Sequence, residues 1–275
     1  MLLFDAATGK LVGPALTGHT EQVNGARFSA DGRILATAAA DGTARLWNVE
    51  TGEDIGVPFV HDVPVTDAVL SPDGRILATA ARDGSARLWN AETGNLMGAP
   101  LRAHAESIGG LAFSQDGHLL ATASNDGTAR LWNSATGEAR GAPLAGHVHE
   151  VYVAAFSPDG RTLATGSYDG VIRLWDTASR KPRGAPLSAH QNPVFSVTFS
   201  PDGRLMTSAS QDGAVWIWDV AGGRPVANPL VGDPDFNEDG HVFIRTVCLS
   251  PDARLLATVP DTGGVRLHPV GPRVP

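Results

Sequence analysis

Short runs of alternating apolar and polar residues recur along the chain with a period of about 43 residues. Such alternation is typical of strands that bury one face. In one period the pattern predicts four strands, over Val65–Leu70, Arg75–Ala81, Ser85–Asn90 and Leu96–Leu101. The sequence therefore predicts an all-β chain built from repeated units of four short strands.

Turn residues separate these runs at fixed places. Asp73-Gly74 and Asp83-Gly84 divide the first three strands of the second unit, and Asp-Gly between alternating runs predicts two-residue type I′ hairpins. The fourth run carries a proline in each unit, which places it at a sheet edge because proline cannot donate to the ladder. These prolines are Pro14, Pro58, Pro100, Pro143, Pro186 and Pro229. Four-stranded antiparallel units repeated in this way predict the blades of a β-propeller.

A tryptophan marks the end of the third strand in five units. It closes Arg-Leu-Trp-Asn or a close variant, at Trp47, Trp89, Trp132, Trp175 and Trp218. A weaker copy ends at His268, and residues 1–17 match only a third and a fourth strand. Residues 231–242 form an acidic insertion before the sixth unit. The chain thus contains six repeat units and an N-terminal half-repeat.

These features resemble the tryptophan-aspartate (WD) repeat family, whose signature is Gly-His near the start and Trp-Asp at the end of each repeat. Gly18-His19 and Gly146-His147 match in full. A histidine stands 28 residues before the tryptophan in five units, as from His19 to Trp47. The likeness covers nearly the whole chain, and it implies one propeller domain over residues 1–275, of the bacterial type.

The resemblance also implies a buried hydrogen-bonded set in each blade, which joins the tryptophan, a hydroxyl, the histidine and an aspartate. The hydroxyl residues are Thr37, Thr79, Thr122, Thr165 and Ser208, and the aspartates are Asp41, Asp83, Asp126, Asp169 and Asp212. Hydroxyl, histidine and aspartate also make a nucleophilic triad. Five equivalent copies favour the structural interpretation. In the sixth unit His268 replaces the tryptophan, so we expect this blade to lack the intact set.

The number of blades stays open at this point. Residues 1–17 could supply the fourth strand of the sixth unit and close a ring of six blades. The family's commonest ring has seven blades, and on that interpretation one blade lacks its first two strands. Either way, we expect the chain to be a remnant or shortened form of a longer one.

The composition of the chain argues against several classes of function. The 275 residues carry a formal charge of −8 with only two lysines, unlike the clustered basic face of a nucleic-acid-binding protein. Cys248 is the single cysteine, and the N-terminus lacks the pattern of a signal peptide, which predicts a cytoplasmic protein. No apolar run predicts a membrane span.

No motif predicts a cofactor or a catalytic centre. The acidic stretch Asp233–Asp239 offers the oxygen ligands that Ca²⁺ prefers. However, Glu238 stands where a calcium loop needs glycine, and Ile244 stands where it needs glutamate. We interpret the stretch as an exposed acidic loop and expect no metal and no cofactor.

The resemblance implies that partners dock on one end of the strands. Two positions in each repeat recur in recognition there, five residues after the histidine and one before the aspartate. The candidate partner-binding residues at these positions are Tyr152, Tyr168, Phe195, Arg82, Arg245 and Asn24. Aromatic residues and arginine are enriched at binding hot spots. Equally, the aromatic side chains could plug the mouth of the central channel.

Trp216 replaces the arginine that stands two residues before the tryptophan in four other units. Residues two apart on a strand share a face, so we expect Trp216 to lie beside Trp218.

The leading functional hypothesis is a non-enzymatic scaffold that binds an unknown protein or peptide, as part of a larger bacterial signalling protein. We expect a monomer if the ring closes. One alternative is an enzyme with its site at the channel mouth, and another is a structural remnant without a partner.

Overall fold

The computed structural model describes residues 1–5, 8–226, 228, 230–231, 244–249, 255–260 and 266–269. Two compact units make up the chain. Unit 1 comprises residues 1–122 and 131–140, and unit 2 comprises residues 123–130 and 141–275. We describe each unit by itself. In the described ranges no helix is long and apolar enough to cross a membrane.

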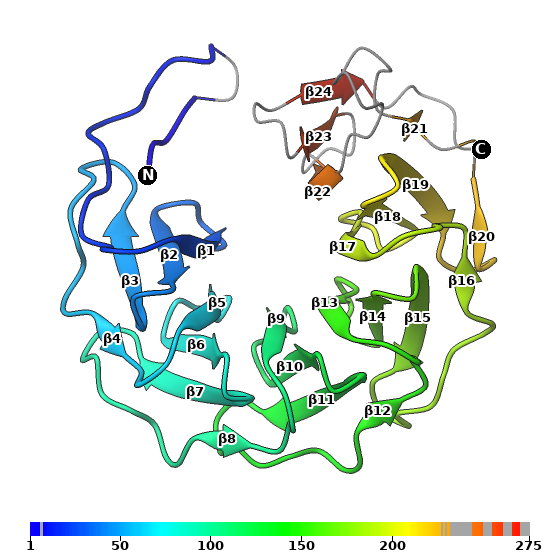
Figure 1. Cartoon of the computed structure of the whole chain (residues 1–275), viewed down its shortest axis with the longest axis horizontal. Helices are drawn as coiled ribbons and strands as arrows, with labels where there is room; N and C mark the ends of the chain where they lie inside the picture. Colours follow the sequence, from blue (N-terminus) through cyan, green and yellow to red (C-terminus); the bar gives the residue numbers. More distant parts are fainter. Residues whose placement is uncertain are drawn as a thin grey trace. The chain divides into compact units, whose positions relative to one another are not determined.

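The described elements are all strands, arranged in six antiparallel sheets (Figure 1). Two sheets belong to unit 1: β1 (Val23–Phe28), β2 (Ile34–Ala39), β3 (Thr43–Asn48) and β4 (Phe59–Val60), then β5 (Val65–Leu70), β6 (Ile76–Ala81), β7 (Ser85–Asn90) and β8 (Leu101–Arg102). The third sheet contains β9 (Ile108–Phe113), β10 (Leu119–Ser124), β11 (Thr128–Asn133) and β12 (Leu144–Ala145). Each sheet runs in simple up-and-down order from its first strand, as the repeat predicted.

Unit 2 holds the remaining sheets. The fourth contains β13 (Val151–Phe156), β14 (Thr162–Ser167), β15 (Val171–Asp176) and β16 (Leu187–Ser188). The fifth contains β17 (Val194–Phe199), β18 (Leu205–Ser210), β19 (Ala214–Asp219), β20 (Arg224–Pro225) and β21 (Leu230–Val231), and the sixth contains β22 (Ile244–Leu249), β23 (Leu255–Pro260) and β24 (Arg266–Pro269). The prediction of an all-β chain of antiparallel blades is confirmed.

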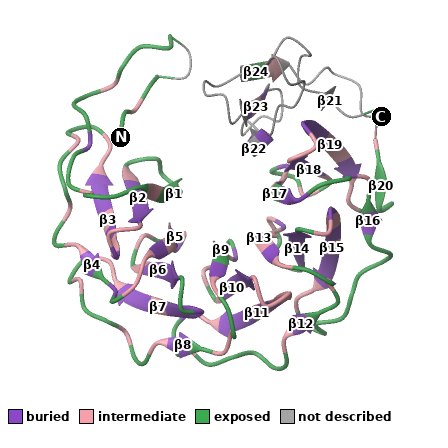
Figure 2. Ribbon diagram, viewed as in Figure 1, coloured by how far each residue is buried: buried purple, intermediate pink, exposed green. Residues whose placement is uncertain are grey.

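The second strand of each sheet lies deepest in the core (Figure 2). All six residues of β14 are buried, and β2 and β6 carry the same sequence, Ile-Leu-Ala-Thr-Ala-Ala, with five of six residues buried. Alanine and threonine suit these strands because side chains from both faces are enclosed, and small residues let the neighbouring sheet approach. Leucines and the repeat tryptophan then fill the space between sheets, as around Leu77 and Trp89 in unit 1.

The turn type predicted for the Asp-Gly pairs is wrong. A type I′ turn needs positive φ at both central residues, yet Arg180 is the one non-glycine with positive φ among the described residues. Instead, Gly84 adopts φ of 78° and its N–H donates to the Ala81 carbonyl three residues back, as in a type I turn followed by a glycine bulge. Asp83 stabilises this turn by accepting the Ser85 N–H at 3.0 Å.

The fourth strand is also shorter than predicted. In place of one run over Leu96–Leu101, a bridge pairs Trp89 with Leu96, and β8 then pairs only Leu101 and Arg102 with β7. Gly98, with φ of 73°, bends the chain between these two pieces, and Pro100 has no N–H with which to continue the ladder.

The N-terminal half-repeat belongs to unit 1 and pairs through an isolated bridge. Phe4 pairs with Leu11, and the Met1 amino group donates to the Leu16 carbonyl at 2.8 Å. Leu16 packs with Trp47 on the first sheet. The prediction that residues 1–17 complete a blade stays a prediction.

The predicted hydrogen-bonded sets are present. In each of five sheets the indole N–H donates to a buried hydroxyl on the second strand at 2.8–3.0 Å, and the histidine Nε2 lies 2.7–2.8 Å from the same hydroxyl. Aspartate completes the set at His19, His147 and His190, with Nδ1 to carboxylate distances of 3.0, 3.4 and 3.0 Å.

Two sheets depart from this arrangement. His61 Nδ1 is buried without a hydrogen-bond partner. Asp83 accepts from the Ser85 hydroxyl at 2.6 Å through one carboxylate oxygen, and its other oxygen lies 3.6 Å from Arg102 Nη1. In the sixth sheet His268 Nε2 lies 3.0 Å from the Thr258 hydroxyl, so histidine takes the contact that tryptophan makes elsewhere. In the sequence of the sixth unit, His241 and Asp261 stand one residue out of register with the histidine and aspartate of the other units. Both lie outside the described residues.

We predict that the shared hydroxyl stabilises its blade by about 2 kcal/mol, since its loss leaves a buried indole N–H and an imidazole nitrogen without their partner. Thr165→Val should lower the free energy of unfolding by this amount in denaturant titration. Thr207→Val is the matched control, because the Thr207 hydroxyl is equally buried but has no hydrogen-bond partner. This control should be neutral or stabilising. Equal losses in both variants would contradict the prediction.

Candidate functional site

β-bulges place the first set of candidate residues. In five sheets the pairing of the first strand with the second shifts register by one residue at the same point. The extra residues are Asn24, Thr66, Tyr152, Phe195 and Arg245. A bulge re-aims the side chain of its unpaired residue. The repeat therefore offers one re-aimed side chain at the start of each of these first strands.

The second set lies in the hairpin turn at the same end of the strands. Tyr168 directly follows β14, and its N–H donates to the Glu150 carbonyl, two residues before the bulge at Tyr152. Arg82 repeats this geometry, with its N–H on the Pro64 carbonyl. The backbone thus brings the two candidate positions of one blade side by side.

In unit 2 these positions form an aromatic cluster, which we define as His149, Tyr152, Tyr168 and Phe195. The Tyr152 ring lies 6.2 Å from Tyr168 in an edge-on contact and 5.7 Å from Phe195 in a tilted contact, measured between centroids. His149 contacts Tyr168 edge-on at 6.0 Å. These separations lie in the range of favourable aromatic pairs.

The aromatic cluster is open to solvent. Tyr168 is 50 % exposed, Phe195 is 37 % exposed, and the adjacent Val148 is 78 % exposed. Burial raises the pKa of the Tyr152 phenol above its usual value of 10, helped by the negative charge of Glu150 and by Tyr168. At neutral pH Tyr152 therefore presents an uncharged phenol close to the Glu150 carboxylate.

Sequence reasoning identified three of these four rings and missed His149. The signal lay in His147-Val148-His149, where the first histidine belongs to the buried set and the second precedes Tyr152 by three residues.

The other candidates do not join the aromatic cluster. Asn24 and Arg82 belong to unit 1. Asn24 is exposed, and its side-chain amide donates to the Val65 carbonyl of the next sheet at 2.8 Å. Thr66 makes the equivalent bond to the Ile108 carbonyl. Arg82 is exposed. Arg245 is a bulge residue of β22, and its side chain lies outside the described part of the structure.

Trp216 lies beside Trp218 as expected, with 6.0 Å between ring centroids. In the first two sheets an arginine holds this place, and Arg45 and Arg87 set their guanidinium carbons 5.9 and 6.0 Å from the tryptophan centroid. Trp216 thus replaces a cation over the ring with a second ring, and its role is packing.

The buried hydroxyl, histidine and aspartate sets are built for structure. Each hydroxyl is already engaged by the indole and the imidazole, and Thr165 and Ser208 are fully buried. Burial lowers the pKa of His147, and it lowers the pKa of His61 to about 4, with the Arg87 charge adding to the effect. A histidine so weakly basic and so enclosed is a poor general base.

Among the described residues, no group of three or more histidine, cysteine, aspartate or glutamate side chains could hold a metal ion. The acidic stretch Asp233–Asp239 lies outside the described residues.

Comparison with known proteins identifies the class. The family of WD domain, G-beta repeats matches the chain five times, over residues 9–48, 52–90, 96–133, 141–176 and 181–219. This is more than half of the chain, so the protein belongs to the WD40 repeat family. With its six antiparallel sheets, it is a WD40 β-propeller of about six blades.

One relative is the Notchless protein homolog of Arabidopsis thaliana, which is 40 % identical over 57 residues. The match covers 21 % of this chain and 12 % of that protein. It therefore supports the repeat and says nothing of a shared activity.

We predict that His61 makes unit 1 sensitive to acid. Its pKa of about 4 in the folded chain lies below the usual 6.5, so the unfolded chain binds more protons between these values. Stability is then complete above pH 6.5 and is lost as the pH falls toward 4, by up to roughly 3 kcal/mol.

Denaturant titration from pH 7 to 4 measures this loss. His61→Gln should remove most of the pH dependence in that window. His118→Gln should leave it unchanged, because His118 is exposed on the same unit. An unaltered pH profile in His61→Gln would show that other groups set it.

Proposed function

We propose that this protein is a non-enzymatic interaction module whose aromatic cluster anchors a protein or peptide partner. Repeats of the WD40 family generally mediate protein–protein interactions, and the family is typically non-enzymatic. The observation that carries the proposal is the exposed contact chain of Tyr168, Tyr152 and Phe195, built at the bulge and turn positions of two neighbouring sheets.

Two physical arguments support this site. Aromatic rings bury a large area for little loss of conformational entropy, and they dominate binding hot spots. The rings also rest on a rigid base, since Tyr168 and Tyr152 stand on segments joined by the backbone bond from Tyr168 to Glu150. A preorganised surface loses less freedom on binding.

We also propose Asn24 and Arg82 of unit 1 and Arg245 of unit 2 as partner-binding residues, on the strength of their repeat positions. Asn24 would contribute mainly through its bond to Val65, which fixes the bulge. A role within a larger bacterial signalling protein in the cytoplasm rests on the family resemblance and on the single cysteine.

Selection of a displayed random peptide library on the purified chain tests the site. We expect enriched peptides to bind Tyr168→Ala and Phe195→Ala at least tenfold more weakly than the unaltered chain, because truncating a central ring removes more than 1 kcal/mol of binding free energy. Titration calorimetry of synthetic peptides gives the dissociation constants.

Phe28→Ala is the matched control. Phe28 is 57 % exposed at the far end of β1 in unit 1, so its removal should change affinity less than twofold. Thermal melting must show that each variant stays folded. If the enriched peptides bind both aromatic variants as tightly as the unaltered chain, the aromatic cluster is not the docking site.

A further inference from the structure

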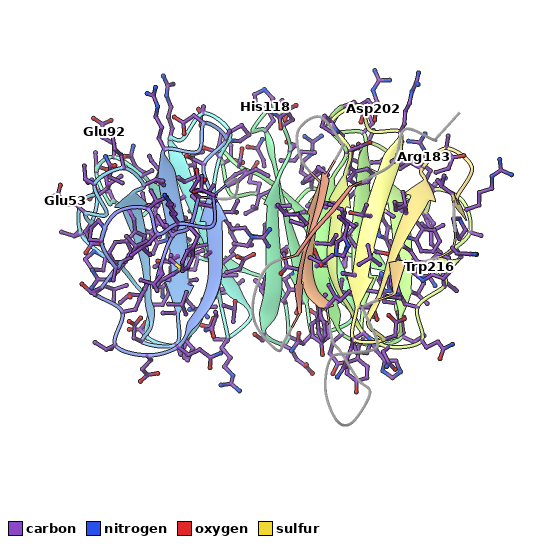
Figure 3. The ribbon with its side chains drawn as sticks, turned by 90° about the horizontal axis from the view of Figure 1, so that it is seen from above. Glu53, Glu92, His118, Arg183, Asp202 and Trp216 are labelled. Carbon is purple, nitrogen blue, oxygen red and sulfur yellow. The ribbon has the colours of Figure 1, made fainter. Side chains whose placement is uncertain are left out.

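A second candidate site lies at the opposite end of the strands of unit 2. A cleft of about 870 Å³ opens where the fourth and fifth sheets meet beyond the ends of β13 and β19. Its lining includes Thr162, Arg183, Asp202, Arg204, Leu205 and Arg224. Figure 3 shows Arg183 and Asp202 together at this end of the unit. The six residues of β13 separate the cleft from the aromatic cluster by roughly 20 Å.

A polar pair replaces the apolar pair that the first two sheets carry at the equivalent place. There, Ile34 and Ile55 pack against the core between the first two sheets, and Ile76 and Met97 do so between the next two. At the same repeat positions the fourth sheet has Thr162 and Arg183.

The Thr162 side chain fixes the guanidinium of Arg183. Arg183 Nη1 donates to the Thr162 hydroxyl at 2.7 Å, and Thr162 is 2 % exposed. Because this hydroxyl is buried and holds the guanidinium at the cleft, Arg183 has a fixed position there, unlike an arginine that extends freely into solvent.

The three arginines of the cleft have donors to spare. Within the described part of the chain, no ion pair involves Arg183, Arg204 or Arg224. Each guanidinium carries five N–H donors in a planar fork that matches a carboxylate or phosphate.

The carboxylates of the cleft are committed to their own turns. Asp159 accepts the Ser157 hydroxyl at 2.6 Å and the Arg161 N–H at 3.0 Å, and Asp202 accepts the Ser200 hydroxyl and the Arg204 N–H at the same distances. Asp219 accepts the Ala221 N–H at 3.2 Å. These bonds lower the pKa of Asp159 and Asp202, so both stay ionised.

These carboxylates also limit the ligand. With three acids among three arginines the cleft is close to neutral, so it does not suit a polyanion such as nucleic acid. Leu205, Val220 and Val226 add an apolar part to the lining. The arrangement suits one anionic group carried beside an apolar side chain.

We propose that this cleft binds an acidic side chain, carboxylate or phosphate, of a peptide segment in which that side chain is flanked by an apolar residue. Arg183, Arg204 and Arg224 donate to the anion, and Thr162 positions Arg183. The site is independent of the aromatic cluster, so each can be tested while the other fails.

Nuclear magnetic resonance of the full ¹⁵N-labelled chain tests the proposal through the arginine Nε–H signals. The probes are capped pentapeptides of sequence glycine-leucine-X-leucine-glycine, in which X is glutamate, phosphoserine or glutamine. We expect at least one acidic peptide to shift the signals of Arg183, Arg204 and Arg224 in a saturable manner, and the glutamine peptide to leave them unchanged. The tighter of the two acidic peptides identifies the anion.

Arg183→Met should weaken binding of the acidic peptide at least tenfold. Arg140→Met is the matched control, because Arg140 holds the same repeat position in unit 1 and is exposed like Arg183; it should change affinity less than twofold. Thr162→Val keeps the charge but loses the bond to Arg183, and we expect it to weaken binding several-fold without moving the Nε–H signals of Arg204 and Arg224.

Three results would overturn the proposal. They are equal shifts with the glutamine peptide, no shift at these arginines up to 10 mM of either acidic peptide (roughly the weakest affinity that a three-donor site should show), and unchanged affinity in folded Arg183→Met.

Discussion

One buried hydroxyl in each blade holds the structure together. It stands on the second strand, accepts the indole N–H from the third strand, and bonds the histidine that precedes the first strand. A single side chain thus links the second strand, the third strand and the segment before the first strand of the blade. Its burial makes the bonds strong and makes their loss costly, since no water can replace them. Where the family partner is missing, the hydroxyl still finds another, as Thr258 does with His268.

The same bonds reach the surface through the aspartate. Asp169 follows Tyr168 directly, and it contacts both His147 and the Val148 N–H in the loop that leads to Tyr152. One carboxylate therefore joins the loop that leads to Tyr152 with the turn that carries Tyr168. These two segments hold three of the four rings of the aromatic cluster. Asp41 and Asp212 join the corresponding loops of their own blades. The buried hydrogen-bonded set in this way also fixes the geometry of the proposed binding surface. This explains how short loops can present a rigid site.

The sequence predicted where the repeated elements lie, and it missed details of backbone conformation within them. Strand positions, the tryptophan contacts and the pairing of Tyr152 with Tyr168 follow from the period, because each copy corroborates the others. The turn type was wrong because Asp83 stabilises its turn with a side-chain bond that leaves its own φ negative. The gap in the fourth strand depends on one glycine bend, at Gly98, before a proline. The open space around Arg183 could not be predicted, because it depends on which residues fill a gap between two sheets.

Strict repetition also shows where function can vary. Serine and aspartate form the same turn after the first strand in five sheets, with hydroxyl to carboxylate distances of 2.6 Å throughout. The residues at these positions are required for the turn, so they give no information about a partner. The side chains of the bulge residue and of the pair represented by Thr162 and Arg183 face no such constraint, since only their backbone groups take part in the hydrogen bonds that the blades share. Tyr152 and Phe195 stand where the first two blades have Asn24 and Thr66, and Arg183 stands where they have Ile55 and Met97. The third blade already carries Arg140 at that last position, but Leu119 opens its second strand. In the fourth blade Thr162 opens the second strand instead, and its hydroxyl accepts a hydrogen bond from Arg183. The change that builds the cleft is therefore the pairing of a hydroxyl with an arginine, because an arginine alone at this position has no neighbouring acceptor to fix its guanidinium.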